Sequence, residues 1–471
     1  MLLLAVAVFI GSQQCRPCHA AVFDAYAKTP MARSSGRVEF LAPARFTAAG
    51  HRYQIADITL LFPGGSATID YFLGSNAAGR SYLRQYEGYL FELPVTWYAQ
   101  KQTWDASPGY EDHKEVHLTR AVEASCLQCH ASRVRPVLGT QNRFGDPPFL
   151  ENGVACERCH GPGSDHAQAP AKSNIVNPAR LHPERRDAVC SQCHLTGEAR
   201  IERPGRKFAE FRAGDRLADY ATYFVSKMGR KDLKVTSHVE KLAASACKTA
   251  SGDQLWCGTC HDPHTNADNS QPACQGCHQT AHRQQERCVT CHMPRAKAVD
   301  ANHGVMTDHS IPRKPSREPQ PKFESLTPFL GLTDDRALGL AYAELGDPRS
   351  AASLSRAEPQ DWPVQLRLAV LEPDPARAAQ LYESVLRANP YEPVALVNLG
   401  THLARQGRNL EAGRLWDRAL LANPALEDAV LNLTQIRPAN DSRLLLQKYL
   451  EVNPVSRKAL RRLTELRTAA P

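Results

Sequence analysis

Seven copies of the pattern Cys-x-x-Cys-His are spread through this sequence of 471 residues. Two cysteines at this spacing can add their thiols across the vinyl groups of one porphyrin, and the histidine that follows can bind the porphyrin iron from one face. Chance predicts only about 0.02 such patterns in a chain of this composition. The sequence therefore predicts seven covalently bound haem c groups, at Cys15-Cys18-His19, Cys126-Cys129-His130, Cys156-Cys159-His160, Cys190-Cys193-His194, Cys257-Cys260-His261, Cys274-Cys277-His278 and Cys288-Cys291-His292.

Other uses of paired cysteines explain the pattern less well. Zinc knuckles do not need a histidine directly after each pair, and seven pairs do not divide into four-ligand sets. A disulfide framework suits small secreted domains, and thioredoxin-like chemistry uses a single pair. The pattern leaves one of the 15 cysteines, Cys247, unused. We interpret Cys247 as a buried thiol, with ligation of iron as the alternative.

The charge and the N-terminal residues argue against a nucleic-acid-binding protein and against a membrane-spanning one. The formal net charge is +8, and because each ferric haem with two propionates adds roughly −1, seven haems bring the total close to neutral. No long run of Lys or Arg is present, so we expect no nucleic-acid partner. Residues 1–10 are apolar but too short to span a bilayer, and we interpret them as a truncated signal-like segment. We expect no transmembrane segment elsewhere.

Thioether attachment of haem normally takes place outside the cytoplasm. We therefore expect export to the periplasm or the cell surface, and contact with the haem maturation machinery. Redox partner proteins are expected as well, since haem groups exchange electrons with other carriers.

The composition changes along the chain and predicts a mainly α fold. Residues 11–310 carry every motif and predict a heptahaem domain of short helices and coil. Residues 36–110 lack the motif and predict a small antiparallel sheet, on the alternation at Tyr53 and Ile55, a turn after Phe62 and a second strand pair at 89–91 and 95–98. Residues 311–330 are rich in proline and predict a linker.

A repeat with a period of about 34 residues fills 331–466. Its clearest copy, 393–426, places Gly400, Ala412 and Trp416 where small residues let paired helices approach and an aromatic fills the gap between repeats. The segment resembles the tetratricopeptide family. The resemblance implies an α-solenoid with a concave face on which a protein partner docks.

The second ligand of each iron decides what a haem does. An iron bound on both faces transfers electrons, whereas one open face can bind substrate. His166 follows a Gly-Pro-Gly turn, and His264 lies too close to its own motif to bind that iron, so both are expected to cap neighbouring haems. We interpret His51, His182 and His282 as surface or hydrogen-bonded residues. The candidates for distal ligands are Met31, His117, His166, His238, His264, His303 and His309.

Residues 9–313 resemble multihaem cytochromes of the cytochrome c-554 and hydroxylamine oxidoreductase-like superfamily. The resemblance is carried by the segments 11–19, 29–33, 156–163, 257–264, 288–294 and 307–309. It implies closely packed haems with mostly His/His ligation, in the periplasm or at the cell surface. Met31 stands where that superfamily has a histidine, which puts His/His ligation of that haem in doubt. The superfamily also includes enzymes that act on small nitrogen oxyanions and amines.

The favoured hypothesis is an exported electron-transfer protein whose repeat domain docks a partner. The alternative is a multihaem oxidoreductase with one open haem that acts on a small nitrogen compound such as nitrite or hydroxylamine. A third hypothesis is an assembly protein in which the repeats recruit other chains. No residue is nominated as catalytic, so the sequence leaves the enzyme question open.

Overall fold

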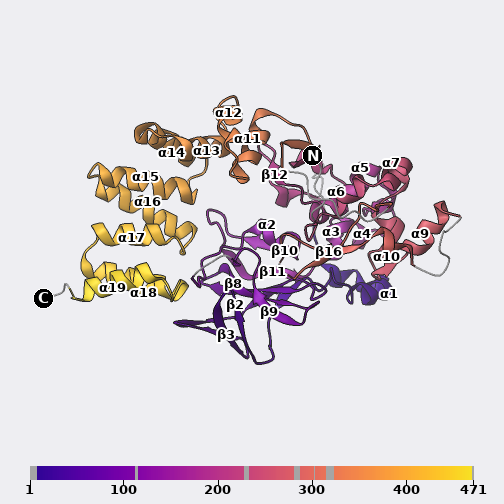
Figure 1. Cartoon of the computed structure of the whole chain (residues 1–471), viewed down its shortest axis with the longest axis horizontal. Helices are drawn as coiled ribbons and strands as arrows, with labels where there is room; N and C mark the ends of the chain where they lie inside the picture. Colours follow the sequence, from indigo (N-terminus) through magenta and orange to yellow (C-terminus); the bar gives the residue numbers. More distant parts are fainter. Residues whose placement is uncertain are drawn as a thin grey trace.

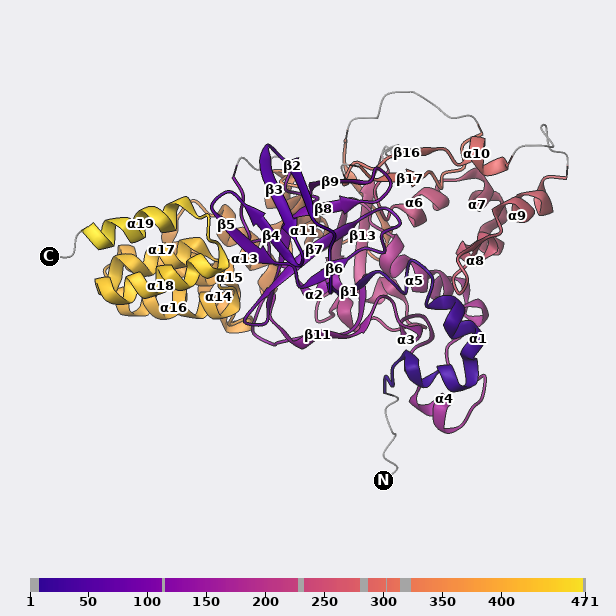
Figure 2. The ribbon, with the colours of Figure 1, turned by 90° about the horizontal axis from the view of Figure 1, so that it is seen from below.

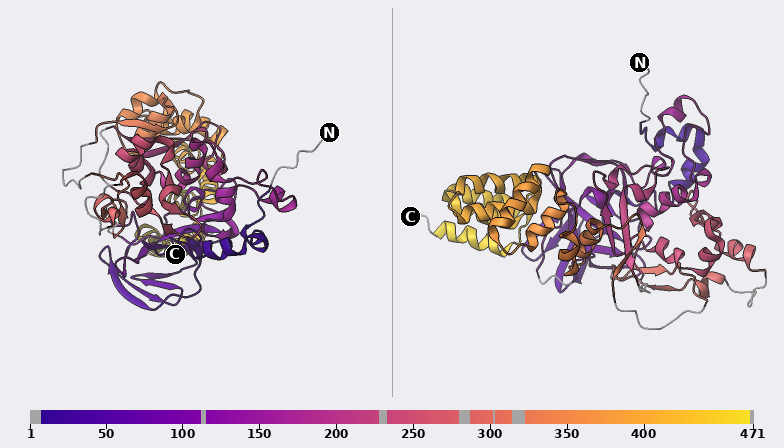
Figure 3. Two further views of the ribbon diagram at one scale, coloured as in Figure 1. Left: turned by 90° about the vertical axis from the view of Figure 1, so that its right-hand side faces the viewer. Right: turned by 90° about the horizontal axis from the view of Figure 1, so that it is seen from above.

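The computed structural model describes residues 8–111, 115–227, 233–279, 287–301, 303–313 and 323–468. The molecule is elongated (Figures 1 and 2). Paired helices form one end, antiparallel sheets the middle, and short helices with the haem motifs the other end. The end that carries the Cys-x-x-Cys-His motifs is here called the haem-bearing half. Viewed along the long axis, the paired helices lie behind it (Figure 3). No helix among the described residues is both long and apolar enough to cross a membrane.

Two antiparallel sheets occupy the range where the sequence predicts one. The first has the order β1-β6-β7-β8-β9 and the second the order β2-β3-β4-β5. Alternate side chains such as Tyr53, Ile55 and Leu60 pack into a common core. The strands are β1 (Ser35–Arg37), β2 (Ala44–Ala48), β3 (His51–Ala56), β4 (Thr59–Phe62), β5 (Gly65–Thr68), β6 (Tyr71–Leu73), β7 (Arg80–Tyr86), β8 (Tyr89–Tyr98) and β9 (Thr103–Ala106).

The strand pair predicted at 89–91 and 95–98 is wrong, because both segments belong to the single strand β8. Pro94 lies inside this strand, and proline is tolerated where a backbone N–H is not needed by a neighbouring strand. In its first half β8 pairs with β7 and with the segment 120–122, and in its second half with β7 and β9. It is therefore an inner strand of the five-stranded sheet, with neighbours on both sides.

The haem-bearing half consists of short helices joined by coil. The helices are α1 (Arg16–Tyr26), α2 (Ala124–Leu127), α3 (Cys156–His160), α4 (Ser164–Gln168), α5 (Pro183–His194), α6 (His238–Ala243), α7 (Ala246–Ser251), α8 (Cys257–Cys260), α9 (Ser270–Cys277) and α10 (Cys288–His292). Small two-stranded sheets lie between them: β10 (Ala131–Pro136) with β11 (Phe144–Asn152), β14 (His261–Asp262) with β15 (Ala267–Asp268), and β16 (Arg295–Lys297) with β17 (Val305–Thr307).

A three-stranded sheet connects the two halves of the molecule. It has the order β12 (Ala199–Glu202), β13 (Ala221–Ser226), β18 (Leu326–Leu330). The predicted linker over 311–330 thus includes a paired strand at its end, and its proline-rich part at 314–322 lies outside the described residues. Side chains from this sheet, Phe224 among them, share a core with the first helices of the C-terminal region, where Leu340 and Leu354 lie.

The C-terminal region is a stack of antiparallel helices, here called the helical stack. Successive helices pack against each other, so the stack descends beside the sheets (Figure 1). The helices are α11 (Asp335–Glu344), α12 (Arg349–Leu354), α13 (Trp362–Leu371), α14 (Pro375–Ala388), α15 (Pro393–Arg405), α16 (Asn409–Ala422), α17 (Glu427–Ile436), α18 (Ala439–Val452) and α19 (Arg457–Thr468).

Close helix approach in the stack depends on small residues, as the sequence pattern predicts. A Cβ atom at Gly400 would lie 2.6 Å from Nε1 of Trp416, and one at Gly339 would lie 2.7 Å from Leu354. Trp416 is 2 % exposed and donates its indole N–H to the Val397 carbonyl at 3.2 Å. The indole thus fills the space that glycine leaves open, with its polar atom satisfied.

One edge of the helical stack packs against the two antiparallel sheets of residues 35–106, here called the sheet wall. Arg84 of β7 donates to the carbonyls of Val452 (2.9 Å) and Glu451 (3.0 Å), and Tyr89 of β8 donates to the Leu421 carbonyl (2.6 Å). Tyr89 and Phe91 also share a small apolar core with Val452. We call this contact the seam. The fold is therefore a mixture of helix and sheet, and the expected mainly α class holds only in part.

Candidate functional site

A single cavity of about 3600 Å³ runs through the haem-bearing half. Both cysteines and the histidine of every motif line it, from Cys15 near the N-terminus to His292 in α10. None of the fifteen cysteines, all at described positions, forms a disulfide. Ordinary protein interiors are close-packed, with few voids larger than a water molecule. The cavity therefore has the character of a space shaped for large apolar groups.

The motifs form short helical turns at the edge of this cavity. Cys156 to His160 make up α3, Cys257 to Cys260 make up α8, and Cys288 to His292 make up α10. Residues three apart lie on the same face of a helix. Both thiols of a motif are thus turned the same way, and the next residue places its imidazole beside them.

Imidazole pairs test whether porphyrin iron fits here. Two imidazoles that bind one metal ion from opposite sides have ring centroids roughly 6 Å apart, since metal–imidazole bonds are about 2 Å long. The centroids of His19 and His166 are 6.2 Å apart with ring planes 15° from parallel. Those of His160 and His264 are 5.9 Å apart at 19°. Both pairs join a motif histidine to a predicted distal ligand, and both separations fit.

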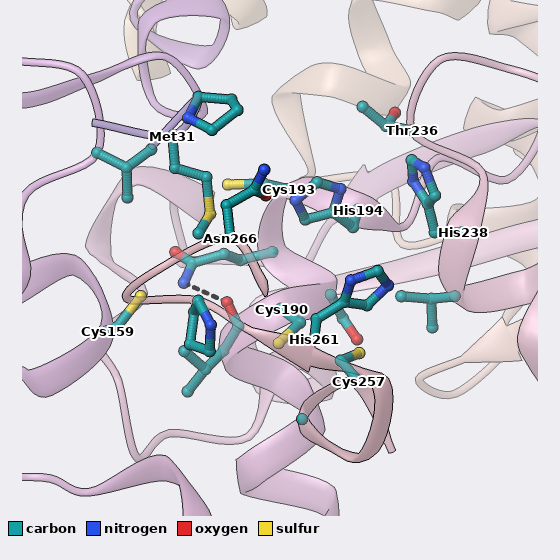
Figure 4. A pocket seen from close by; sticks show the side chains of 18 of the residues that line it. Met31, Cys159, Cys190, Cys193, His194, Thr236, His238, Cys257, His261 and Asn266 are labelled. Atoms are coloured by element: carbon teal, nitrogen blue, oxygen red, sulfur yellow. Dashed lines mark hydrogen bonds between the residues drawn. The ribbon is translucent and has the colours of Figure 1, made fainter. Parts of the chain in front are cut away.

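Two further motif histidines belong to a cluster. His261 and His309 have centroids 6.3 Å apart, whereas His194 and His238 are closer, at 5.2 Å. His238 also lies 4.7 Å from His309, so these four rings form one group, called here the histidine cluster. His194, His238 and His261 project toward the same space, with Cys190 and Cys257 beside them (Figure 4).

Hydrogen bonds orient several of these rings. The Nδ1 atoms of His160, His166 and His309 lie 2.8, 3.0 and 3.0 Å from backbone carbonyl oxygens, those of Val176, Ala171 and Thr307. A carbonyl only accepts, so Nδ1 carries the proton and donates. Nε2 is then left with its lone pair, which is the form that binds a metal ion.

The environment of the cluster keeps three of its imidazoles uncharged. Burial, with the neighbouring His309, lowers the pKa of His194 to about 4. Burial, with His194 next in importance, lowers the pKa of His238 to about 3, and burial also lowers the pKa of His309. Neutral imidazole is the ligand form of histidine, so these three rings are ready to bind iron at neutral pH.

Thiols of different motifs lie close enough to influence one another. Cys15 interacts with Cys156, Cys129 with Cys193, Cys190 with Cys257, and Cys274 with Cys288. Each contact joins two motifs, and the fourth motif takes part in two of them. Groups attached at these cysteines would lie edge to edge, so the motifs form a connected series.

Comparisons with known proteins agree with this chemistry. A family model described as cytochrome c554 and c-prime matches residues 96–161, which include the second and third motifs. A multiheme cytochrome MtrA from Shewanella baltica (strain OS185) is 25% identical over 180 residues, 33% of this chain and 52% of that protein. The chain thus matches about half the length of this curated relative.

This chain is a multihaem c-type cytochrome, with covalently bound haem c. Two solved structures are also similar to parts of the cytochrome. The outer cell wall cytochrome OcwA has a TM-score of 0.43 and 13% identity, covering 90% of this chain and 99% of that one. MamA has a TM-score of 0.21 and 17% identity, covering 28% of this chain and 77% of that one.

The predicted distal ligands of the cytochrome fall into two groups. Met31, His166, His238, His264 and His309 all line the cavity. His117 and His303 do not: His117 stacks on Tyr110, and Nε2 of His303 is 2.7 Å from the Asp105 carboxylate in β9. The sequence could not show the contact of His303, because Asp105 lies 198 residues away in the chain, and no sequence pattern indicates that Tyr110 stacks on His117. Of the remaining histidines and methionines in this region, Met293 and Met306 also line the cavity, and those at positions 113, 228 and 282 lie outside the described residues.

Two carboxylates at this site, Glu157 and Glu92, were not predicted from the sequence. Glu157, inside the third motif, accepts hydrogen bonds from the backbone N–H groups of Ile10 (2.9 Å), Gly11 (2.8 Å) and Gly163 (2.8 Å). It thereby fastens the segment before the first motif onto α3. Glu92 of β8 lines the cavity wall near Cys126. Neither has a local sequence signal, since their partners are remote in the chain. Cys247, which the sequence predicts to be a buried thiol, is only half-buried and lines the cavity.

Proposed function

We propose that this chain is an exported heptahaem cytochrome that moves electrons along a series of closely packed haems. The observation that carries the proposal is the single cavity lined by all three residues of every motif. Seven separate pockets would isolate the redox centres, whereas one continuous space lets neighbouring porphyrins approach. Haem c supplies reversible one-electron chemistry at iron.

Different residues of the chain are proposed to attach the porphyrin and to bind its iron. The motif cysteines anchor the porphyrin edges and the motif histidines bind iron from one face. His166 faces His19, His264 faces His160 and His309 faces His261, so we propose these three as distal ligands. His238 is proposed for the iron of His194, and Met31 remains a candidate on the cavity wall.

The contacts between motifs support a path for electrons. The thiol pairs and the imidazole pairs join the first motif to the third, the third to the fifth, and the second to the fourth and on to the fifth. The sixth and seventh are joined to each other by Cys274 and Cys288, and the sixth to the fifth by Cys260 and Cys274, whose charges interact. The proposed path therefore reaches every motif.

The helical stack is proposed to be a tetratricopeptide-like solenoid that receives a protein partner. Its small-residue contacts at Gly339 and Gly400 are the ones the family pattern requires. The seam occupies one edge of the stack. The partner is therefore expected on a face of the stack that the sheets leave uncovered.

The test is spectroscopy of the mature holoprotein, together with its mass. The proposal predicts a mass that includes seven haem groups, and reduction of all of them by an external one-electron donor. A spectrum of six-coordinate low-spin iron alone fits pure electron transfer. A high-spin fraction that shifts on addition of nitrite or hydroxylamine would instead favour the oxidoreductase alternative.

A further inference from the structure

The wall of the cavity carries a polar patch beside the second motif. Ser81 of β7 and Glu92 and Thr96 of β8 line the cavity there, with Arg120 and Cys126 on the neighbouring segment. Burial raises the pKa of the Cys126 thiol, and the charge of Glu92 adds a smaller contribution to that rise. The haem attached at Cys126 therefore has a carboxyl group for a neighbour.

A row of hydroxyl groups leads away from this carboxyl group. Glu92 is hydrogen-bonded to Ser81, Oγ of Ser81 lies 2.8 Å from Oγ1 of Thr96, and Oγ1 of Thr96 lies 2.9 Å from Oγ of Ser107. Ser107 is fully buried, and its hydroxyl donates to the Leu93 carbonyl at 2.8 Å.

The direction of these hydrogen bonds depends on the proton of Glu92. Each hydroxyl has one proton to donate, and a carbonyl can only accept. With the Ser107 proton on the Leu93 carbonyl, Thr96 donates to Ser107 and Ser81 donates to Thr96. Ser81 can then only accept, from a protonated Glu92. An ionised Glu92 instead accepts the Ser81 proton in a hydrogen bond that lowers the pKa of Glu92. Ionisation requires the whole row to reverse.

The charges around Glu92 leave its two forms close in energy. Burial raises the pKa of Glu92 to about 7, while Arg120, whose Nη1 is 3.2 Å from the carboxylate, opposes that rise. The Glu92 side chain is 15% exposed and that of Arg120 is 44% exposed, so the pair connects the cavity wall with solvent. The titratable and charged groups that interact with Glu92 are Arg120, Glu111, Tyr98, Tyr110 and Cys126.

We propose that Glu92 is the proton-binding partner of the haem attached at Cys126 and Cys129, an inference that rests on the proposed electron transfer. When one electron from a neighbouring haem reduces that iron from the ferric to the ferrous state, Glu92 takes one proton from water. When the electron moves on, Glu92 returns the proton to solvent. The added negative charge favours the neutral carboxylic acid, because repulsion between like charges is poorly screened in a buried site.

The test is potentiometric titration of the holoprotein at several pH values. The proposal predicts that one haem has a potential that falls as pH rises through the range around 7. Glu92→Gln keeps the shape of the side chain, and we expect it to abolish this pH dependence. Asp70→Asn is the matched control: Asp70 is also a partly buried carboxylate next to these strands, but it does not line the cavity.

The outcomes separate the two proposals. If no haem accepts electrons, the proposed function is wrong. If the haems are reduced but none of the potentials changes with pH, or the slope persists in Glu92→Gln, the inference about Glu92 is overturned and any proton belongs to another group such as a propionate. An infrared difference spectrum of the unmodified protein provides a second measurement, since reduction must produce the band of a protonated carboxyl group. Absence of that band also overturns the inference.

Discussion

The helical stack and the haem-bearing half differ in what fills their interiors. In the stack, Trp416 and its neighbours fill the space between helices, and side chains alone make the core. In the haem-bearing half the same function falls to attached groups, and the protein atoms enclose about 3600 Å³. Helices there are short, since a porphyrin rather than a neighbouring helix has to be covered. The stack should therefore be stable without cofactor, and the haem-bearing half should not.

Removal of one attachment site should have the largest effect. Cys190→Ala with Cys193→Ala deletes the thiols of the fourth motif, which interact with Cys257 and Cys129 of two other motifs. We expect loss of one haem from the mass and failure of the haem-bearing half to accumulate. Cys247→Ala is the control, because it lies outside every motif and should keep the full haem complement. Equal haem content in both variants would contradict the expectation that the fourth motif attaches a haem on which the haem-bearing half depends.

Truncation in the stack should destabilise it without loss of haem. Trp416→Ala removes a side chain that is 2 % exposed, and the cavity left behind should lower the free energy of unfolding of the stack by about 3–5 kcal/mol. Leu410→Ala on the same helix is 84% exposed and should change it by less than about 0.5 kcal/mol. Thermal unfolding followed by circular dichroism, with the Soret band recorded in parallel, separates the two halves. A matching loss of Soret intensity would show that they are not independent.

Loss of a distal imidazole should change one iron and leave the fold intact. His264→Ala removes the ring 5.9 Å from His160, so one haem should become high-spin in electron paramagnetic resonance and near-infrared spectra. His303→Ala is the matched control, since that ring is bonded to Asp105 outside the cavity. An unchanged spectrum for His264→Ala would remove this residue from the ligand set.

The smallest effect is expected at the seam. Arg84→Ala deletes two hydrogen bonds to the carbonyls of Glu451 and Val452, which should cost about 1–3 kcal/mol locally. Hydrogen exchange in α18 and α19 should become faster while the haem spectrum stays the same. Arg45→Ala, on β2, removes an exposed arginine elsewhere in the sheets and should leave that exchange unaltered. Faster exchange in both would assign the effect to the sheets rather than to the seam.

The sequence was most informative where chemistry or packing repeats at fixed spacing. The motifs and the Gly400–Trp416 contact are local patterns: every motif lines the cavity, and Gly400 lies against Trp416. His166 and His264 could be nominated because each follows a motif by a few residues. His303 could not be judged, because its partner Asp105 lies 198 residues away in the chain. His117 could not be judged either, because its stacking on Tyr110 follows no sequence pattern.

The strand β18 and the surroundings of Glu92 could not be predicted, because both depend on contacts between residues far apart in the chain. The strand β18 looks like linker because its partner β13 lies far away in the chain, and Glu92 looks like an ordinary strand residue. Its neighbours Arg120 and Cys126 become visible only when β8 is placed against the second motif. Sequence periodicity carries no information about such contacts, since it reports only residues close together in the chain.

The imidazole pairs have a consequence for biosynthesis. Each pair joins an early part of the polypeptide to a later one, as His19 meets His166 and His160 meets His264. A nascent chain that ends before residue 160 has neither second ring. The prosthetic groups must consequently be ligated to an open polypeptide, whose enclosure is completed by later segments of the chain. Completion of the first site should therefore wait for His166 and that of the third site for His264, however soon their thiols react.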